Sequence, residues 1–252
     1  MKGEGSTIIF SCEGLTRLYD GVPVVRDVSV ALPEGGFVSL VGPSGVGKTT
    51  LFHLLSGVDR PDEGRVLLAG EDVTGLAGRV SYMLQKDLLF EFYTVLDNVI
   101  LPLTLRGIPK KQARHDASAY FPQFGLSGFE NKYPRQLSGG MRQRAALLRT
   151  CLTDNKVILL DEPFSALDAI TRREMQTWYV DIAQSMKLST LCITHDVEEA
   201  VILSDTVCVM TGRPGQITAR IDIPFARPRG KDFQTSQAFA TLKREILDAI
   251  GV

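Results

Sequence analysis

The sequence predicts an α/β fold in which helices cover a parallel sheet, with an added antiparallel β portion and a helical insert. A glycine-rich turn joins an apolar strand at residues 37–41 to a helix at 49–56, which ends at Gly57. Strand and helix patterns alternate between residues 156 and 210, as is typical of a parallel sheet. The segment 86–155 has helical patterns instead and therefore predicts an insert.

Strand patterns dominate the first part of the chain. Runs of apolar and β-branched side chains predict strands at residues 7–10, 22–32, 37–41, 65–68 and 80–84. We place the antiparallel β portion among the first of these runs, at the N-terminal side of the fold.

The predicted insert has recognisable helix starts. Thr94 and Asp97 resemble a capping box, and Pro109 is placed to open the next helix. Ser138 begins a longer stretch of helix-forming residues. We therefore expect a helical subdomain between two sheet-forming parts of the chain.

The remaining elements complete the predicted sheet and add a tail. Strands are expected at 156–160, 189–194 and 206–210, with a long helix at 168–186 and a short helix from Asp196. The turn Gly212-Arg213-Pro214-Gly215 leads to a last strand at 217–223, and residues 237–250 have amphipathic helical spacing. The expected plan is one domain with a core at 1–85 and 156–223, an insert at 86–155 and a tail at 224–252.

The glycine-rich turn fits the phosphate-binding pattern Gly-x-x-x-x-Gly-Lys-Thr. Glycines let backbone N–H groups curl around phosphate oxygens, and the helix N-terminus adds partial positive charge. The pattern assigns Lys48 to the β- and γ-phosphates and the Thr49 hydroxyl to Mg²⁺. A chance match has a frequency of roughly one per cent for a chain of this size. The predicted nucleotide-contacting residues are Gly42, Pro43, Ser44, Gly45, Val46, Gly47, Lys48, Thr49 and Thr50.

Composition narrows the alternatives. The 252 residues suffice for one large domain, and a net charge of −1 gives no reason to expect a nucleic-acid partner. The four cysteines are far apart and lack a Cys-x-x-Cys pair, so neither a zinc site nor a disulfide framework is predicted. No apolar run approaches the length of about 18 residues that a membrane helix needs, and we expect a cytosolic protein.

Two further motifs show which nucleotide-binding proteins the chain resembles. The run Leu137-Ser138-Gly139-Gly140-Met141-Arg142-Gln143-Arg144 precedes an apolar strand that ends in Asp161, Glu162 and Pro163. Together with the phosphate loop, these motifs resemble those of the ATP-binding subunits of ABC transporters over residues 8–222. The resemblance implies a P-loop NTPase core of the ABC type, ATP and Mg²⁺ as cofactors, and ATPase activity.

The two carboxylates follow a strand whose carboxyl end lies at the same sheet edge as the phosphate loop. There Asp161 would hold Mg²⁺ through its water shell, and Glu162 would orient or deprotonate the attacking water. Taken alone, the pair is as typical of a solvated strand end as of catalysis. The order of the motifs favours catalysis.

The resemblance assigns roles to four more residues. Gln85 matches the glutamine that senses Mg²⁺ and water and joins the core to the insert. Asp168 matches the loop that crosses the dimer interface, and His195 matches the histidine that contacts the γ-phosphate. Tyr19 matches the aromatic residue that stacks on adenine, with a partly buried packing tyrosine as the alternative.

Ser138, Gly139 and Gly140 form a second anion-binding device at a helix N-terminus. One nucleotide cannot use both devices within one chain. In the family, these residues of one subunit close over ATP held by the phosphate loop of the other. The resemblance therefore implies action in trans and a second copy of the chain as partner, with a helix cap of no catalytic meaning as the alternative.

The C-terminal part resembles the ATP-binding subunits of nitrate, sulfonate, taurine and thiamine-precursor importers. The matching segments are 212–223, Arg227-Pro228-Arg229 and 242–247, whereas Phe90-Glu91-Phe92-Tyr93 replaces the proline and tryptophan common in that group. The resemblance implies separate integral-membrane permease subunits, an indirect solute-binding protein, a position at the cytoplasmic face of the cell membrane, and a small anionic or heterocyclic solute. The alternatives are a soluble ABC-type ATPase acting on nucleic acid or protein complexes, and an ATP-binding switch without turnover.

One segment predicts where the membrane partner docks. The run 88–93 places five apolar or aromatic side chains in a segment with neither strand alternation nor helical spacing. We interpret it as a docking patch borne by a loop, with a small core of the insert itself as the alternative.

Overall fold

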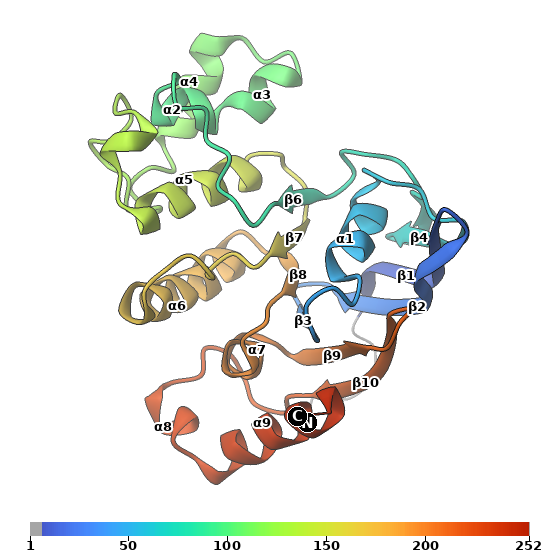
Figure 1. Cartoon of the computed structure of the whole chain (residues 1–252). Helices are drawn as coiled ribbons and strands as arrows, with labels where there is room; N and C mark the ends of the chain where they lie inside the picture. The colour runs from blue at the N-terminus through green and yellow to red at the C-terminus, as the bar shows by residue number, and fades with distance from the viewer. Residues whose placement is uncertain (1–6, 252) are drawn as a thin grey trace.

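A six-stranded sheet forms the centre of the computed structural model, which describes residues 7–251 (Figure 1). Its strand order is β10-β9-β3-β8-β7-β6, and only the pairing of β10 with β9 is antiparallel. The strands are β3 (Phe37–Val41), β6 (Ser81–Met83), β7 (Val157–Asp161), β8 (Ser189–Ile193), β9 (Thr206–Thr211) and β10 (Gln216–Asp222). The α/β class and the parallel sheet predicted from the sequence are confirmed.

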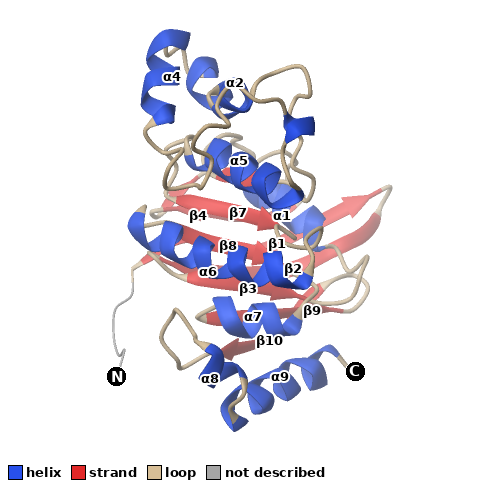
Figure 2. Cartoon of the chain, turned by 90° about the vertical axis from the view of Figure 1, so that its left-hand side faces the viewer, coloured by secondary structure: helices blue, strands red, loops and turns tan. Residues whose placement is uncertain are grey.

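The interior strands β3, β7 and β8 are buried along their whole length because both faces of the sheet are covered. Successive residues face opposite sides, so Val38 and Leu40 pack with α1 (Lys48–Ser56), while Phe37 packs with α6 (Ala169–Ser185). Figure 2 shows α5, α6 and α7 on one side of the sheet. The strand ends are thereby fixed in a rigid frame, and the loops that follow them carry the candidate site.

A second, antiparallel sheet confirms the predicted β portion. Its order is β2-β1-β4-β5, from β1 (Ile8–Tyr19), β2 (Val22–Pro33), β4 (Glu63–Leu68) and β5 (Glu71–Asp72). The prediction of a short first strand at 7–10 was wrong, because β1 continues to Tyr19. The pairing register of β1 with β2 shifts near Gly14, which has a φ of 60°. Because of such register shifts, the sequence of β1 does not show the alternation of apolar and polar residues that predicts a strand.

The regular elements described between β6 and β7 are all helical, as predicted. They are α2 (Val95–Val99), α3 (Leu101–Leu105), α4 (Lys110–Ser118), a short 3₁₀ turn (Pro134–Gln136) and α5 (Gly139–Cys151). The Thr94 hydroxyl accepts a hydrogen bond from the backbone N–H of Asp97 at 3.1 Å, and that of Ser138 accepts from Met141 at 3.3 Å. Pro109 directly precedes α4, so all three predicted helix starts are confirmed.

The C-terminal elements pack against the antiparallel edge of the central sheet. They are α7 (Val197–Leu203), α8 (Lys231–Gln234) and α9 (Gln237–Ile250), and α8 lies in the part of the tail before residue 237, for which the sequence analysis predicts no helix. The apolar face of α9, with Phe239, Leu242 and Ile246, joins α7, β9 and β10 in a separate hydrophobic cluster. Within residues 7–251 no helix combines the length and apolarity needed to cross a membrane. All four cysteines are buried and free.

Candidate functional site

The loop between β3 and α1 requires glycine where its backbone passes close to neighbouring strands. A Cβ at Gly42 would lie 2.0 Å from the carbonyl oxygen of Met210 on β9. At Gly47, where φ is 106°, it would lie 3.0 Å from the side chain of Val25 on β2. Only glycine permits both of these close approaches. The order of β3, loop and α1 confirms the predicted strand-loop-helix arrangement.

The remaining loop residues differ in what they expose. Pro43, Ser44 and Gly45 are exposed, whereas the Val46 side chain is buried and leaves only its backbone for a ligand. Thr50 lies in the first turn of α1, next to Thr49.

Lys48 is buried beneath the loop. Its Nζ donates hydrogen bonds to the backbone carbonyls of Gly42 at 2.8 Å and Pro43 at 2.9 Å. Burial lowers the pKa of Lys48, while the nearby carboxylates of Glu162 and Asp161 act in the opposite direction. The ammonium group is thus fixed between the loop and the two carboxylates.

Asp161 ends β7 and lies beside the start of α1. Its Oδ2 accepts from the Thr49 hydroxyl at 3.4 Å and from the Tyr82 hydroxyl at 3.3 Å. Burial raises the pKa of Asp161. A hydroxyl and a carboxylate, the oxygen donors that Mg²⁺ favours, therefore meet at this point.

Glu162 contacts two other predicted residues, Gln85 and His195. Its Oε2 accepts a hydrogen bond from Gln85 Nε2 at 2.9 Å and lies 3.3 Å from Nδ1 of His195. Its φ of 47° is rare for a residue with a side chain and is held by a hydrogen bond from its N–H to the carbonyl of Ile193. A cavity of about 10 Å³, roughly the volume for one water, is lined by Glu162, His195 and Thr194.

Tyr19 lies at the end of β1, with 42% of its surface exposed. Its hydroxyl donates to Asp59 Oδ2 at 2.8 Å, and the guanidinium carbon of Arg17 lies 4.7 Å from the ring centroid. This exposure disfavours the alternative of a packing tyrosine. A role in adenine stacking stays a prediction.

The serine-glycine-glycine run lies at the start of α5. Ser138 caps the helix, Gly139 is exposed and Gly140 is half-buried. Among the hydrogen bonds of residues 7–251, none joins this run to the phosphate loop. Asp168 likewise caps α6, where its Oδ1 accepts from the backbone N–H groups of Ile170 and Thr171, each at 3.1 Å. The structure thus groups Lys48, Thr49, Gln85, Asp161, Glu162 and His195, and leaves Ser138–Gly140 outside that group.

Sequence reasoning missed the residues that connect this group to the insert. Gln143 on α5 donates a hydrogen bond to the carbonyl of Pro163, next to Glu162. Arg149, also on α5, donates to the carbonyls of Asp87 at 2.6 Å and Leu88 at 2.8 Å, just beyond Gln85. Tyr82 was missed as well, although its position three residues before Gln85 on a strand paired with β7 points to the same edge.

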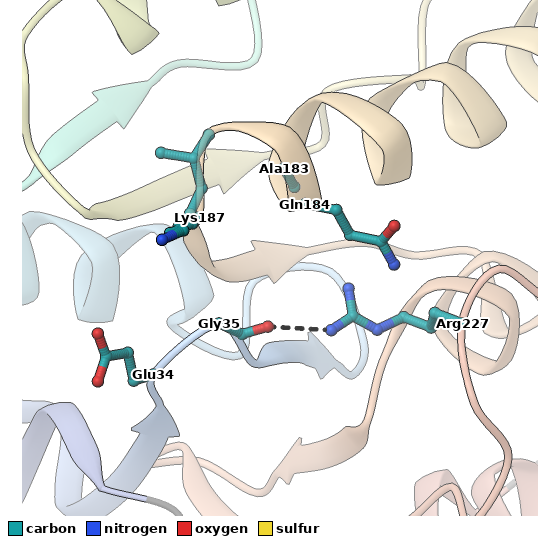
Figure 3. A pocket seen from close by; sticks show the side chains of 7 residues that line it. Glu34, Gly35, Ala183, Gln184, Lys187 and Arg227 are labelled. Carbon is teal, nitrogen blue, oxygen red and sulfur yellow. Dashed lines mark hydrogen bonds between the residues drawn. The ribbon is translucent and has the colours of Figure 1, made fainter.

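A separate cavity of about 340 Å³ is lined in part by Glu34, Lys187 and Arg227 (Figure 3). Glu34 precedes β3, whereas the phosphate loop follows it. The cavity therefore lies toward the opposite edge of the sheet and forms no part of the candidate site.

The chain is similar in sequence to known proteins over most of its length. The family model described as "ABC transporter" matches residues 25–165. An uncharacterised ABC transporter ATP-binding protein of Methanocaldococcus jannaschii is 41% identical over 99% of this chain and 94% of its own length. A formylaminopyrimidine import ATP-binding protein of Halalkalibacterium halodurans is 39% identical over 89% of this chain and 88% of its own. An aliphatic sulfonates import ATP-binding protein of Bacillus cereus is 36% identical over 94% of each.

Solved structures have the same fold. A bacterial ABC transporter cassette solved as a dimer superposes with a TM-score of 0.74 and 25% identity, covering 86% of this chain and all of that one. A cassette from Clostridium perfringens, described as part of an ABC transporter complex, has a TM-score of 0.78 and 23% identity over 86% of this chain and 89% of its own.

Proposed function

The chain belongs to the ABC transporter family and is an ATPase of that family, and we propose that it powers solute import through separate integral-membrane permease subunits. The supporting observation is the convergence of Gln85 and His195 on Glu162, beside Lys48 and Asp161. The names of the relatives support a small anionic or heterocyclic solute. A solute-binding protein would act indirectly, through the permease.

ATP would lie over the phosphate loop, with its phosphates against the backbone of residues 42–49 and the ammonium group of Lys48. The adenine would stack on Tyr19. Thr49, Asp161 and Gln85 fit Mg²⁺ because they supply hydroxyl, carboxylate and amide oxygens. When bound, the ion neutralises charge that develops on the β- and γ-phosphates.

Glu162 would orient the attacking water and accept its proton. The cavity supports this role, because it is a water-sized space that Glu162 and His195 help to line. His195 would then contact the γ-phosphate. Gln85 would couple the presence of the γ-phosphate to the position of the insert. Gln85, Glu162 and His195 would thus all act in the hydrolysis of ATP.

The serine-glycine-glycine run would complete the site of a second copy in a head-to-tail dimer. Ser138 Oγ accepts a backbone hydrogen bond within its own helix, which leaves its hydroxyl proton for an acceptor on the partner's nucleotide. Asp168 would lie at the same interface, where its carboxylate remains bound to the start of α6.

The permease would dock on the exposed loop at residues 88–93. Phe92 is 94% exposed and Phe90 56%, while Leu89 is the buried member of the run. An adjacent groove of about 390 Å³ is lined by Tyr93, Ile100 and Leu101, among others. The exposure supports docking over the alternative of an internal core, and a chain that docks on the permease in this way would lie at the cytoplasmic face of the membrane.

Reconstitution tests this proposal. The chain, co-expressed with permease subunits encoded beside it, should co-purify with them and show ATPase activity that rises with solute-loaded binding protein in vesicles. ATPase activity that responds instead to nucleic acid, without retention by any permease, would favour the soluble alternative.

A further inference from the structure

Arg229 is a buried cation outside the nucleotide site. It lies between β10 and α8 and is 7% exposed, and burial lowers its pKa to about 10. No ion pair within residues 7–251 includes it. Its guanidinium instead donates to five backbone carbonyls, those of Val201, Ile202, Ser204, Ile223 and Phe225.

Three of these carbonyls belong to the end of α7. Arg229 Nη1 lies 2.9 Å from the oxygen of Val201, 3.0 Å from that of Ile202 and 2.7 Å from that of Ser204. The last carbonyls of a helix have no partner within it and carry partial negative charge. Arg229 therefore caps the C-terminus of α7, a helix too short to be stable by itself.

The terminal helix α9 holds the other end of α7. Lys243 Nζ lies 2.6 Å from Oε1 of Glu198, in the first turn of α7. The apolar residues Phe239 and Leu242 of α9 pack with Ala200 and Val201. Figure 1 shows α9 beside α7 and the β9–β10 edge.

The tail itself is fixed to the central sheet. Arg227 Nη2 lies 2.7 Å from Asp205 Oδ2 and 3.2 Å from the Gly35 carbonyl, as Figure 3 shows for the latter contact. Asp205 also accepts the backbone N–H of Phe37, the first residue of β3. The tail thus bridges the start of β3 and both ends of α7.

His195 lies immediately before this helix. Asp196 caps α7 by accepting from the N–H groups of Glu198 and Glu199, and its own N–H donates to the Thr194 hydroxyl. A displacement of α7 would therefore move His195 relative to Glu162, from which it is 3.3 Å away. We infer that residues 224–250 position His195 through α7, with Arg229 and Lys243 as the positioning residues; this inference rests on the proposed role of His195.

The substitution Lys243→Met tests the inference, with Arg244→Met as the matched control. Arg244 is the next residue of α9, is exposed, and takes part in no hydrogen bond or ion pair among the described residues. Lys243→Met should lower kcat by about twofold to fivefold with ATP affinity retained, the factor expected for a lost exposed ion pair. Arg244→Met should leave kcat unchanged.

Histidine NMR gives a readout that does not need activity. The chain has three histidines, and His195→Gln identifies the signal of His195. In Lys243→Met and in Arg229→Lys the His195 ring signal should move, while those of His53 and His115 stay in place. Thermal unfolding of both variants shows whether they remain folded.

Two outcomes would overturn the inference. One is a His195 signal and kcat that are unchanged in folded Lys243→Met and Arg229→Lys. The other is an equal fractional loss of kcat from Lys243→Met in the wild-type and His195→Gln backgrounds, since a positioning effect must vanish without the histidine. Absence of ATPase activity in the wild-type protein would contradict the proposed function instead, and the NMR comparison would still decide whether the tail holds His195.

Discussion

A single carboxylate oxygen, Oε2 of Glu162, joins Gln85 from the insert side to His195 from the α7 side. The two contacts reach it from segments that follow β6 and β8, on either side of β7 in the sheet. Glu162 keeps an uncommon backbone conformation to do so, with a φ of 47°. Strain of this kind, on the order of 1–3 kcal/mol, is typical of functional residues.

Two substitutions separate binding from chemistry at this site. Lys48→Ala should lose most ATP affinity, because in the proposed site Lys48 would supply the positive charge beneath the phosphates. Glu162→Gln should bind ATP but turn it over at least on the order of a hundredfold more slowly, the usual scale for general-base catalysis. ATP binding by calorimetry and steady-state turnover measure the two effects. A Glu162→Gln protein that hydrolyses ATP at close to the wild-type rate would show that another group acts as the base.

Glu199 gives a prediction for pH. It is 4% exposed, accepts a hydrogen bond from Gln176 at 2.9 Å, and has a pKa raised by burial to about 7 from 4.5. Between these two values the folded state binds more protons than the unfolded state, so the free energy of unfolding should fall as pH rises from about 4.5 to 7. The loss approaches about 3 kcal/mol above pH 7. Urea unfolding should show this slope in the wild-type protein and a smaller one in Glu199→Gln; identical slopes would contradict it.

At the scale of elements, the sequence predicts those strands and helix starts whose signals lie in neighbouring residues. The strands β3, β7 and β8 are predicted within one residue of their ends, because burial on both faces leaves short runs of mainly apolar side chains. Starts of α2 and α5 are predicted because their caps are local. The full length of β1 is not, since its register shifts interrupt the alternation.

Contacts between distant segments account for what the sequence does not predict in the candidate site and in the C-terminal tail. Gln143 meets Pro163 only because α5 packs against the loop after β7, and Arg229 meets α7 only after β10 has turned the chain back. Periodicity does not encode such pairings. The phosphate loop and the carboxylates Asp161 and Glu162 are predicted from motifs at one sheet edge, whereas Gln85 and His195 are assigned by the family resemblance.

The loop at 88–93 carries a prediction of its own. Phe90→Asp or Tyr93→Asp should leave folding and ATP binding intact, because both side chains are about half exposed, and should abolish co-purification with the permease and transport-coupled ATPase activity. Leu89→Asp is the matched control, because Leu89 is buried and its substitution should lower thermal stability instead. Phe90→Asp and Tyr93→Asp proteins that unfold would favour an internal core, and folded variants that still bind the permease and support transport would contradict docking.

At the scale of the whole molecule, no hydrogen bond among the described residues joins Ser138–Gly140 to the phosphate loop, and the proposed head-to-tail dimer would bring these two segments together across two copies. Without nucleotide the protein should be largely monomeric. Glu162→Gln with ATP should form a dimer, because slow hydrolysis preserves the nucleotide shared between the Lys48 loop of one copy and Ser138 of the other. Light scattering after size exclusion measures the oligomeric state. Ser138→Arg is the control. A bulky cation at this exposed helix start should block dimer closure and ATP turnover while leaving α5 folded. An ATP-loaded Glu162→Gln that stays monomeric at high concentration, or full turnover by Ser138→Arg, would mean that each copy completes its site alone.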